Sequence, residues 1–240
     1  MKLEHMPNEP EKLQISVSAT DQVTALLYLA SKGERLGVTV LLGHGAGAGQ
    51  QSSFMKLFAG ELAARGLDAM TFNFIYMEQG RSAPDQKLKL ESCYRAVIEE
   101  ALKQRKLKNN RLVIGGKSMG GRIASQVAAA GIAHLAGLVF LGYPLHPPGR
   151  PDRLRAAHLP DIKVPMLFVQ GARDAFGTPE ELRPIMSRLE PSPDLYVVAD
   201  GDHSFKVPKR AGVTQKDIHN AVQDHVAAWL RKTALVRTAR

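Results

Sequence analysis

A serine lies at the centre of a short glycine-rich segment that joins an apolar run to a helix-like run. The segment is residues 116–120 (GKSMG), the run before it is 111–115 (RLVIG), and the run after it is 121–128 (GRIASQVA). This order predicts a strand, a sharp turn and a helix, with Ser118 held at the turn in a strained backbone conformation. Its hydroxyl should therefore project from the tip of a sheet, beside the free N–H groups at the start of the helix.

The same segment has a simpler interpretation as an ordinary Gly/Ser turn between a strand and a helix. The pattern G-x-S-x-G recurs by chance in glycine-rich proteins, so the motif alone does not decide. A strand and a helix crowd together on either side of such a serine and require small residues at the flanking positions. Gly116 and Gly120 meet that requirement, which favours a nucleophilic serine over a plain turn.

The length and composition favour one ordinary globular domain, residues 1–240, with flexible ends at 1–10 and 233–240. Hydrophobic residues make up 44% and charged residues 23% of the chain, as in typical soluble domains. No apolar run approaches the roughly 20 residues that span a bilayer, and the first ten residues lack the apolar core of a signal peptide. A single cysteine, Cys93, excludes an internal disulfide and fits a reducing compartment. We therefore expect a cytoplasmic protein with no membrane partner.

The chain carries 32 Lys and Arg against 23 Asp and Glu, a net charge of +9, which raises the question of nucleic acid as a partner. The basic residues are dispersed, with local concentrations only at 103–108 and 231–240. Neither segment is interleaved with the aromatic residues on which bases could stack. We therefore expect a solvated basic surface and no nucleic-acid partner; the oligomeric state stays open.

Strand-like and helix-like segments alternate, which predicts an α/β fold with a mostly parallel sheet. Residues 38–42 are apolar throughout, as parallel strands covered on both faces should be. The segment 54–65 has helical spacing and stops before Gly66, a residue suited to the end of a helix. The expected strands are 13–18, 23–30, 38–42, 68–74, 112–114, 138–141, 166–170 and 195–198, and the expected helices are 54–65, 87–107, 179–189 and 214–232.

Two connections, 75–86 and 142–163, are longer than the fold requires. Both leave the carboxyl ends of expected strands, the edge at which α/β proteins bind ligands. We expect them to form the walls of a shallow substrate site, without a separate lid or large cap domain. The candidates for the pocket wall are Tyr76, Met77, Tyr143, Leu145 and His146.

A serine hydroxyl needs a base to take its proton, and the base needs an acid to orient it. In a strand–turn–helix arrangement of this kind the chain order is nucleophile, acid, base. Asp174 lies just beyond the expected strand 166–170, and His203 lies just beyond 195–198. The sequence thus predicts that Ser118, Asp174 and His203 converge at one edge of the sheet.

The sequence also allows other assignments of the acid and of the base. Asp174 could be a solvent-exposed turn residue, and Asp200 and Asp202 are competing acids. These two lie so near His203 in the chain that their carboxylates could not easily reach the side of its ring that faces away from the serine. Of the eight histidines, only His203 follows a strand in the right place.

The segment 41–49 (LLGHGAGAG) follows an apolar strand and could cradle an oxyanion. Its glycines allow the backbone to aim N–H groups at a reacting carbonyl oxygen. We expect one donor from Met119 and the other from Ala46, with Gly47 as the alternative, and we expect His44 to brace the loop. A phosphate-binding loop is the competing interpretation, but the glycine spacing does not fit a dinucleotide motif and no Lys-Ser/Thr follows.

With these parts in place the chain resembles the α/β-hydrolase superfamily, and within it the small dienelactone-hydrolase-like members. The stretches that carry the closer resemblance are 72–81, 115–122 and 141–149. They look like a bacterial branch similar to the testis-expressed hydrolase-like protein and to a subunit of a nuclear acetyltransferase complex. Many dienelactone hydrolases carry cysteine at the nucleophile position, where this chain has Ser118.

The resemblance covers nearly the whole chain and implies an eight-stranded sheet that holds the three residues. It implies a serine hydrolase of carboxylesterase or thioesterase type, acting on a small acyl substrate without a metal or an organic cofactor. The alternative is a catalytically idle α/β-hydrolase scaffold for protein interaction. The intact serine, acid and histidine favour the enzyme.

Overall fold

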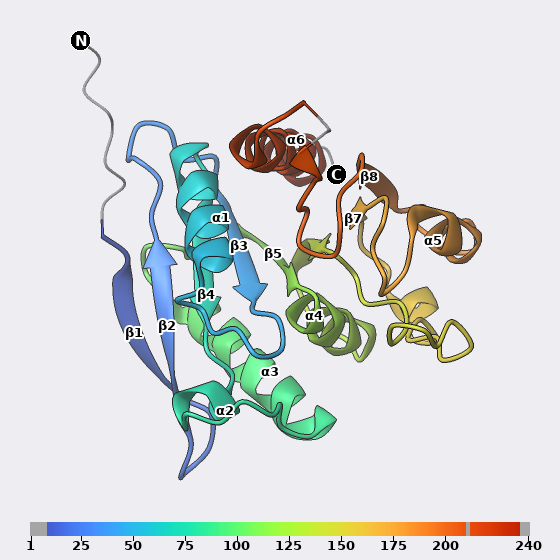
Figure 1. The fold of residues 1–240 in the computed structure, drawn as a ribbon. Coiled ribbons are helices and arrows are strands. Elements are labelled where there is room, and N and C mark those ends of the chain that lie inside the picture. Colours follow the sequence, from blue (N-terminus) through green and yellow to red (C-terminus); the bar gives the residue numbers. More distant parts are fainter. Residues whose placement is uncertain (1–8, 210–211, 236–240) are drawn as a thin grey trace.

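The computed structural model describes residues 9–209 and 212–235. Its centre is one eight-stranded sheet with the strand order β1-β2-β4-β3-β5-β6-β7-β8 (Figure 1). β1 and β2 form an antiparallel hairpin, β2 pairs antiparallel with β4, and the other neighbours are parallel. The strands are β1 (Glu11–Ser16), β2 (Gln22–Tyr28), β3 (Val38–Gly43), β4 (Asp68–Phe72), β5 (Arg111–Lys117), β6 (Leu135–Leu141), β7 (Met166–Gly171) and β8 (Asp194–Val198).

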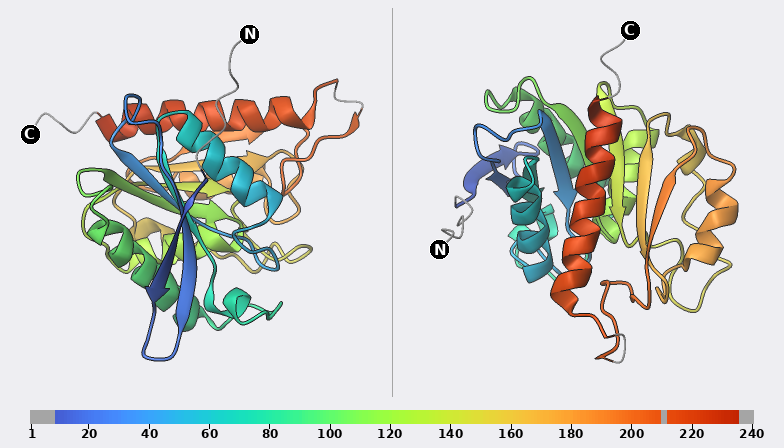
Figure 2. Two further views of the ribbon diagram at one scale, coloured as in Figure 1. Left: turned by 90° about the vertical axis from the view of Figure 1, so that its left-hand side faces the viewer. Right: turned by 90° about the horizontal axis from the view of Figure 1, so that it is seen from above.

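Helices cover both faces of the sheet (Figure 2). α1 and α6 pack together on one face, and α3 and α4 pack together on the other. The helices are α1 (Ser53–Ala64), α2 (Ile75–Glu78), α3 (Lys87–Lys103), α4 (Met119–Ala129), the 3-10 turn η1 (Leu159–Asp161), α5 (Pro179–Met186) and α6 (Gln215–Leu235). The predicted α/β fold with a mostly parallel sheet is confirmed, and the part of the chain that the structure describes contains no large cap domain.

The sheet separates two apolar cores because successive strand residues point to opposite faces. In β3, Leu41 packs on the α3/α4 side, whereas Val40 and Leu42 pack on the α1/α6 side. All six residues of β3 are buried. This double covering explains why the strand is apolar throughout rather than alternating.

The first helix begins and ends where its sequence indicates. The Ser52 hydroxyl accepts a hydrogen bond from the Met55 N–H at 3.5 Å, which caps the amino end. Gly66, with φ of 85°, terminates the helix in the left-handed conformation. The N–H of Leu67 then returns to the carbonyl of Leu62 at 3.1 Å, the pattern of a Schellman ending.

The structure departs from the sequence-based expectation in the connections and at the ends. Residues 75–86 contain the short helix α2, and 142–163 contain the turn η1. Residues 233–235 continue α6, whereas 1–8 and 236–240, also expected to be flexible, lie outside the described residues. Among the helices of the described segments, none combines the length and apolar character needed to cross a membrane.

Candidate active site

Ser118 occupies the turn between β5 and α4 in a strained conformation, with φ of 50° and ψ of −114°. Such angles are rare for a residue with a side chain. The turn is tight because β5 and α4 both approach β3. A Cβ atom at Gly116 would lie 2.2 Å, and one at Gly120 2.1 Å, from the carbonyl oxygen of Gly43. The predicted need for small residues on both sides of the serine is therefore confirmed.

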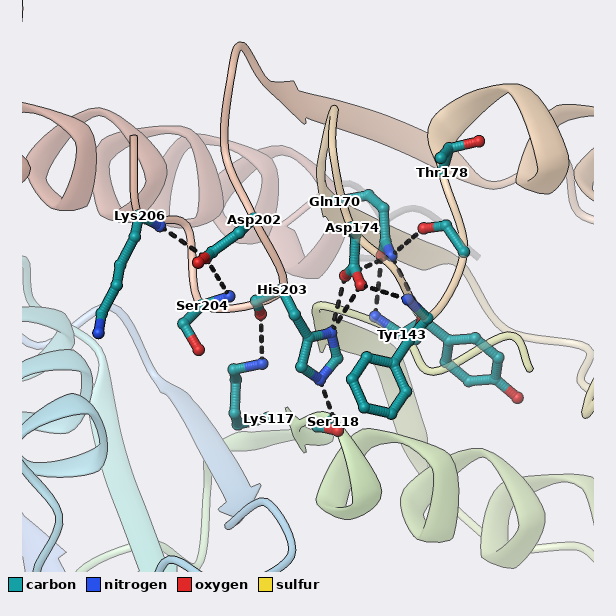
Figure 3. A network of polar contacts seen from close by, with 12 residues as sticks. Lys117, Ser118, Tyr143, Gln170, Asp174, Thr178, Asp202, His203, Ser204 and Lys206 are labelled. Carbon is teal, nitrogen blue, oxygen red and sulfur yellow. Dashed lines mark hydrogen bonds and ion pairs between the residues drawn. The ribbon is translucent and has the colours of Figure 1, made fainter. Parts of the chain in front are cut away.

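The three residues predicted to converge do so in the structure (Figure 3). His203 Nε2 lies 2.8 Å from Ser118 Oγ, and His203 Nδ1 lies 2.9 and 2.8 Å from the two carboxylate oxygens of Asp174. Asp174 follows β7, His203 follows β8 and Ser118 follows β5, so all three sit at the carboxyl edge of the sheet. Asp174 is buried, whereas the His203 side chain keeps 19% of its surface exposed.

The competing acids have other partners. Asp202 Oδ1 accepts the N–H groups of Ser204 and Lys206 at 2.7 and 2.9 Å, which closes a tight turn just after His203. Asp200 uses its backbone carbonyl to accept from the guanidinium of Arg173. The carboxylate that contacts the imidazole is that of Asp174.

Asp174 is oriented by Gln170, a buried residue that the sequence analysis missed. The Gln170 amide donates to Asp174 Oδ2 at 2.8 Å and to the Gly177 carbonyl at 2.7 Å, and it accepts the Tyr143 N–H at 2.8 Å. The Phe176 N–H donates to the other carboxylate oxygen at 2.8 Å. A glutamine inside the otherwise apolar strand 166–171 was the available signal, because buried polar groups must find partners.

Lys117 and Phe176 hold the histidine from two further sides. The Lys117 ammonium donates to the His203 carbonyl oxygen at 2.5 Å, and the Phe176 ring lies 4.2 Å from the imidazole between ring centres. Burial lowers the pKa of Lys117 to about 8, although the charges of Asp174 and Asp202 favour its protonated form. The histidine is thus positioned through its ring and through its backbone.

The loop after β3 contributes backbone donors beside the serine. Ala46 and Met119 both line the cavity, and neither N–H donates a hydrogen bond to any residue of the described segments. Gly47, the predicted alternative donor, does not line the cavity. His44 braces this loop as expected: its ring contacts the Gly45 carbonyl at 2.8 Å and accepts the Phe74 N–H at 3.1 Å. Burial lowers the pKa of His44 to about 4, so the ring is neutral.

A cavity of about 720 Å³ opens above Ser118. The two long connections do contribute walls, Pro84 and Asp85 from one and Pro144 and Arg155 from the other. Further walls come from the loops after β3, β7 and β8, and from helices that were not expected to line the site. The helical wall residues include Phe54 and Leu57 of α1, Lys87 and Leu90 of α3, Arg122 of α4, and Gln215 and His219 of α6.

The five residues predicted for the pocket wall lie elsewhere, and that prediction is wrong. Tyr76, Tyr143 and Leu145 are fully buried. Met77 packs against the same core, and His146 is 4% exposed with its Nε2 3.3 Å from Glu181. The reason is that these apolar and aromatic side chains fill space beneath the connections. The Tyr143 ring, for example, packs at 5.3 Å from that of Phe140, and α2 carries Tyr76 into the core.

The strand order and the serine at the strand–helix turn define an α/β-hydrolase fold. The family model for the alpha/beta hydrolase domain matches residues 37–231, and the chain belongs to this family.

Solved structures share the architecture at low sequence identity. Dienelactone hydrolase from Anabaena variabilis is 20% identical, with 95% of this chain and 100% of that chain covered and a TM-score of 0.73. A lidless serine hydrolase from Xanthomonas campestris is 21% identical over 93% and 96%, with a TM-score of 0.71. An esterase from Pyrococcus furiosus is 16% identical over 94% and 92%, with a TM-score of 0.73. The predicted membership of the α/β-hydrolase superfamily is confirmed, and these structures, dienelactone hydrolase among them, share its fold.

Proposed function

We propose that this protein is a serine hydrolase that cleaves small carboxylic esters or thioesters through an acyl-enzyme. The observation that carries the proposal is the continuous hydrogen-bonded chain from the hydroxyl of Ser118 through His203 to the buried carboxylate of Asp174. This is the arrangement that turns a weakly nucleophilic hydroxyl into a nucleophile. The cavity that Ser118 lines, with room for a small substrate, supports the same role.

In the first half of the reaction, Ser118 Oγ attacks the carbonyl carbon while its proton passes to His203 Nε2. The oxyanion that forms is stabilised by the N–H groups of Ala46 and Met119. Loss of one such donor typically costs about 2.7–4 kcal/mol of transition-state stabilisation. The carbon–oxygen or carbon–sulfur bond then breaks, and the leaving group takes the proton from His203.

In the second half, water attacks the acyl carbonyl and gives its proton to His203 Nε2. The bond between the carbonyl carbon and Ser118 Oγ breaks, the serine recovers the proton, and the carboxylic acid leaves. Asp174 keeps the Nδ1 proton in place and stabilises the imidazolium in both halves. No step calls for a group beyond the chain, the ester and water.

A fluorophosphonate probe tests the proposal, because it labels only an activated serine. We expect wild-type protein to be labelled and Ser118→Ala not to be labelled. Ser204→Ala is the matched control: Ser204 lines the same cavity but lies outside the hydrogen-bonded chain, so labelling should persist. Hydrolysis of p-nitrophenyl butyrate should follow the same pattern. A folded wild-type protein that resists the probe would overturn the proposal and favour a catalytically idle scaffold.

A further inference from the structure

The cavity above Ser118 has two chemically different sides. One side belongs to α1 and α6 and is lined by Phe54, Leu57 and His219. The ring centres of Phe54 and His219 lie 6.2 Å apart. The other side belongs to α4 and the β6–β7 connection, which contribute Arg122 and Arg155. Because α1 and α6 cover one face of the sheet and α4 the other, the serine at the sheet edge lies between two sides. The α1/α6 side offers the apolar groups of Phe54 and Leu57 and also carries the Lys117 ammonium, 5.8 Å from the Phe54 ring, and the other side carries the two arginines.

The backbones of the two arginines are firmly held. Arg122 lies one helical turn after the serine, and its N–H donates to the Ser118 carbonyl at 3.0 Å. Arg155 donates its N–H to the Leu145 carbonyl at 2.7 Å, and its own carbonyl accepts the Tyr143 hydroxyl at 2.7 Å. Two rigid segments thus carry both side chains to the same cavity.

The two guanidinium groups have no counter-charge. Within residues 9–209 and 212–235, neither Arg122 nor Arg155 forms an ion pair or donates a side-chain hydrogen bond. The Arg122 Nε atom is buried without a partner, an arrangement that proteins generally avoid. Burial lowers the pKa of Arg155 and of His158; the charge of Arg122 lowers both further, after that of Lys87 in the case of His158. An anion in the cavity would relieve this repulsion.

The carboxylate in the same cavity is already neutralised. Asp85 forms an ion pair with Arg81 at 2.5 Å and accepts the Tyr76 N–H at 3.0 Å. Lys87, another cation of the cavity wall, lies 3.6 Å from Glu91. The Arg122–Arg155 side therefore keeps a positive charge that nothing among the described residues balances.

We propose that Arg122 and Arg155 form an anion-binding subsite, and that the preferred substrates are esters or thioesters bearing a carboxylate or phosphate on one side of the scissile bond and an apolar group on the other. Guanidinium groups suit this task because their planar N–H donors match the oxygens of both anions. The catalytic part of the inference rests on the proposed function, whereas anion binding does not depend on it.

Two pairs of isosteric esters test the preference. One pair places the charge on the acyl side: mono-p-nitrophenyl glutarate and p-nitrophenyl 5-methylhexanoate. The other places it on the leaving group: the butyrate esters of 4-hydroxybenzoate and of 4-isopropylphenol. We expect kcat/KM of the charged member to exceed that of the neutral member by about 10- to 100-fold in one pair, the range for hydrogen bonds to a charged group. Equal rates within both pairs would overturn the proposal.

Substitutions of the two arginines test whether they cause the preference for charged esters. Arg122→Gln and Arg155→Gln should each reduce the charged-ester rate at least about tenfold more than they reduce the neutral-ester rate. Arg153→Gln is the matched control, since Arg153 is an exposed arginine of the same connection that does not line the cavity, and it should retain the preference. If Arg122→Gln does not fold, Arg155→Gln still tests the proposal, because Arg155 lies in an irregular segment outside the helices and strands. Equal losses on charged and neutral esters would contradict an anion subsite.

Direct binding separates this inference from the proposed function. Isothermal titration of glutarate and of inorganic phosphate into the wild-type protein should show binding that weakens at least about tenfold in Arg155→Gln and not in Arg153→Gln. The tighter of the two ligands identifies carboxylate or phosphate as the recognised group. Binding without hydrolysis of any ester would refute the hydrolase and support the subsite. Absence of binding by both anions at about 10 mM, or binding indifferent to both arginines, would refute the subsite even if neutral esters are hydrolysed.

Discussion

Replacing Lys117 by methionine should make the stability of this protein depend on pH in a defined way. The Lys117 side chain is 9% exposed, and its ammonium lies 5.8 and 5.9 Å from the ring centres of Phe54 and Phe205. Burial lowers its pKa from 10.5 to about 8. The folded protein therefore carries a charge that its surroundings disfavour at neutral pH.

The magnitude follows from the pKa difference between the folded and unfolded states. A fall from 10.5 to about 8 corresponds to about 3 kcal/mol of unfolding free energy. At pH 7 both states are protonated, so the folded state bears the full penalty. As the pH rises from about 8 to 10.5, folded Lys117 loses its proton before the unfolded chain does, and the penalty disappears. Wild-type stability should therefore rise relative to a variant without this ammonium.

Urea unfolding of wild type and Lys117→Met at pH 7 and pH 10 measures the effect. At pH 7 we expect the variant to be the more stable by about 1–3 kcal/mol, less than the full penalty because the hydrogen bond to His203 is lost. By pH 10 the difference should shrink by about 2–3 kcal/mol. Lys206→Met is the control: Lys206 lines the same cavity but is exposed, so its difference should not change with pH. A Lys117→Met difference that is equally constant would refute the reasoning.

Three further substitutions test the support around the site. Asp174→Asn should lower kcat by about 10³–10⁴, measured with p-nitrophenyl butyrate, because a neutral amide no longer stabilises the imidazolium and can hold His203 in the wrong tautomer; a fall of less than tenfold would contradict the role. Gln170→Leu should reduce the unfolding free energy, measured in urea, by about 2–4 kcal/mol, because the buried polar groups that the amide contacts would lose their hydrogen-bond partner. A change within about 0.5 kcal/mol would show that these groups find other partners. Gly116→Ala would place a Cβ 2.2 Å from the Gly43 carbonyl and should abolish cooperative unfolding by circular dichroism; a normal transition would mean that β3 can move aside.

The convergence of Ser118, Asp174 and His203 was predictable because their placement depends on local patterns. Apolar strands are recognised from a few consecutive residues, and the carboxyl ends of parallel strands share one edge. A serine after the strand at 111–117, an aspartate after that at 166–171 and a histidine after that at 194–198 must then lie near one another. The close approach of Gly43 to Gly120 follows from the same short-range geometry.

The cavity walls were not predictable in this way. Which side chains of α1 and α6 face the serine depends on how each helix is rotated on the sheet, and the helical period alone does not reveal that. Aromatic residues in a long connection such as 75–86 are ambiguous between lining a pocket and filling the core beneath it, and Tyr76 fills the core. Arg155 lies in an irregular segment whose sequence gives no sign that its side chain turns toward the site.

His203 shows why contacts beyond the hydrogen-bonded chain of Ser118, His203 and Asp174 matter. It lies in a segment with no regular secondary structure, so no helix or strand fixes its ring. Asp174 holds the ring nitrogen, Phe176 holds the ring face and Lys117 holds the carbonyl. These contacts act on different atoms, and the loss of one leaves the imidazole constrained by the others. Removing the Lys117 ammonium alone should therefore lower kcat far less than Asp174→Asn does, because Asp174 and Phe176 still hold the ring, and equal losses in the two variants would contradict this.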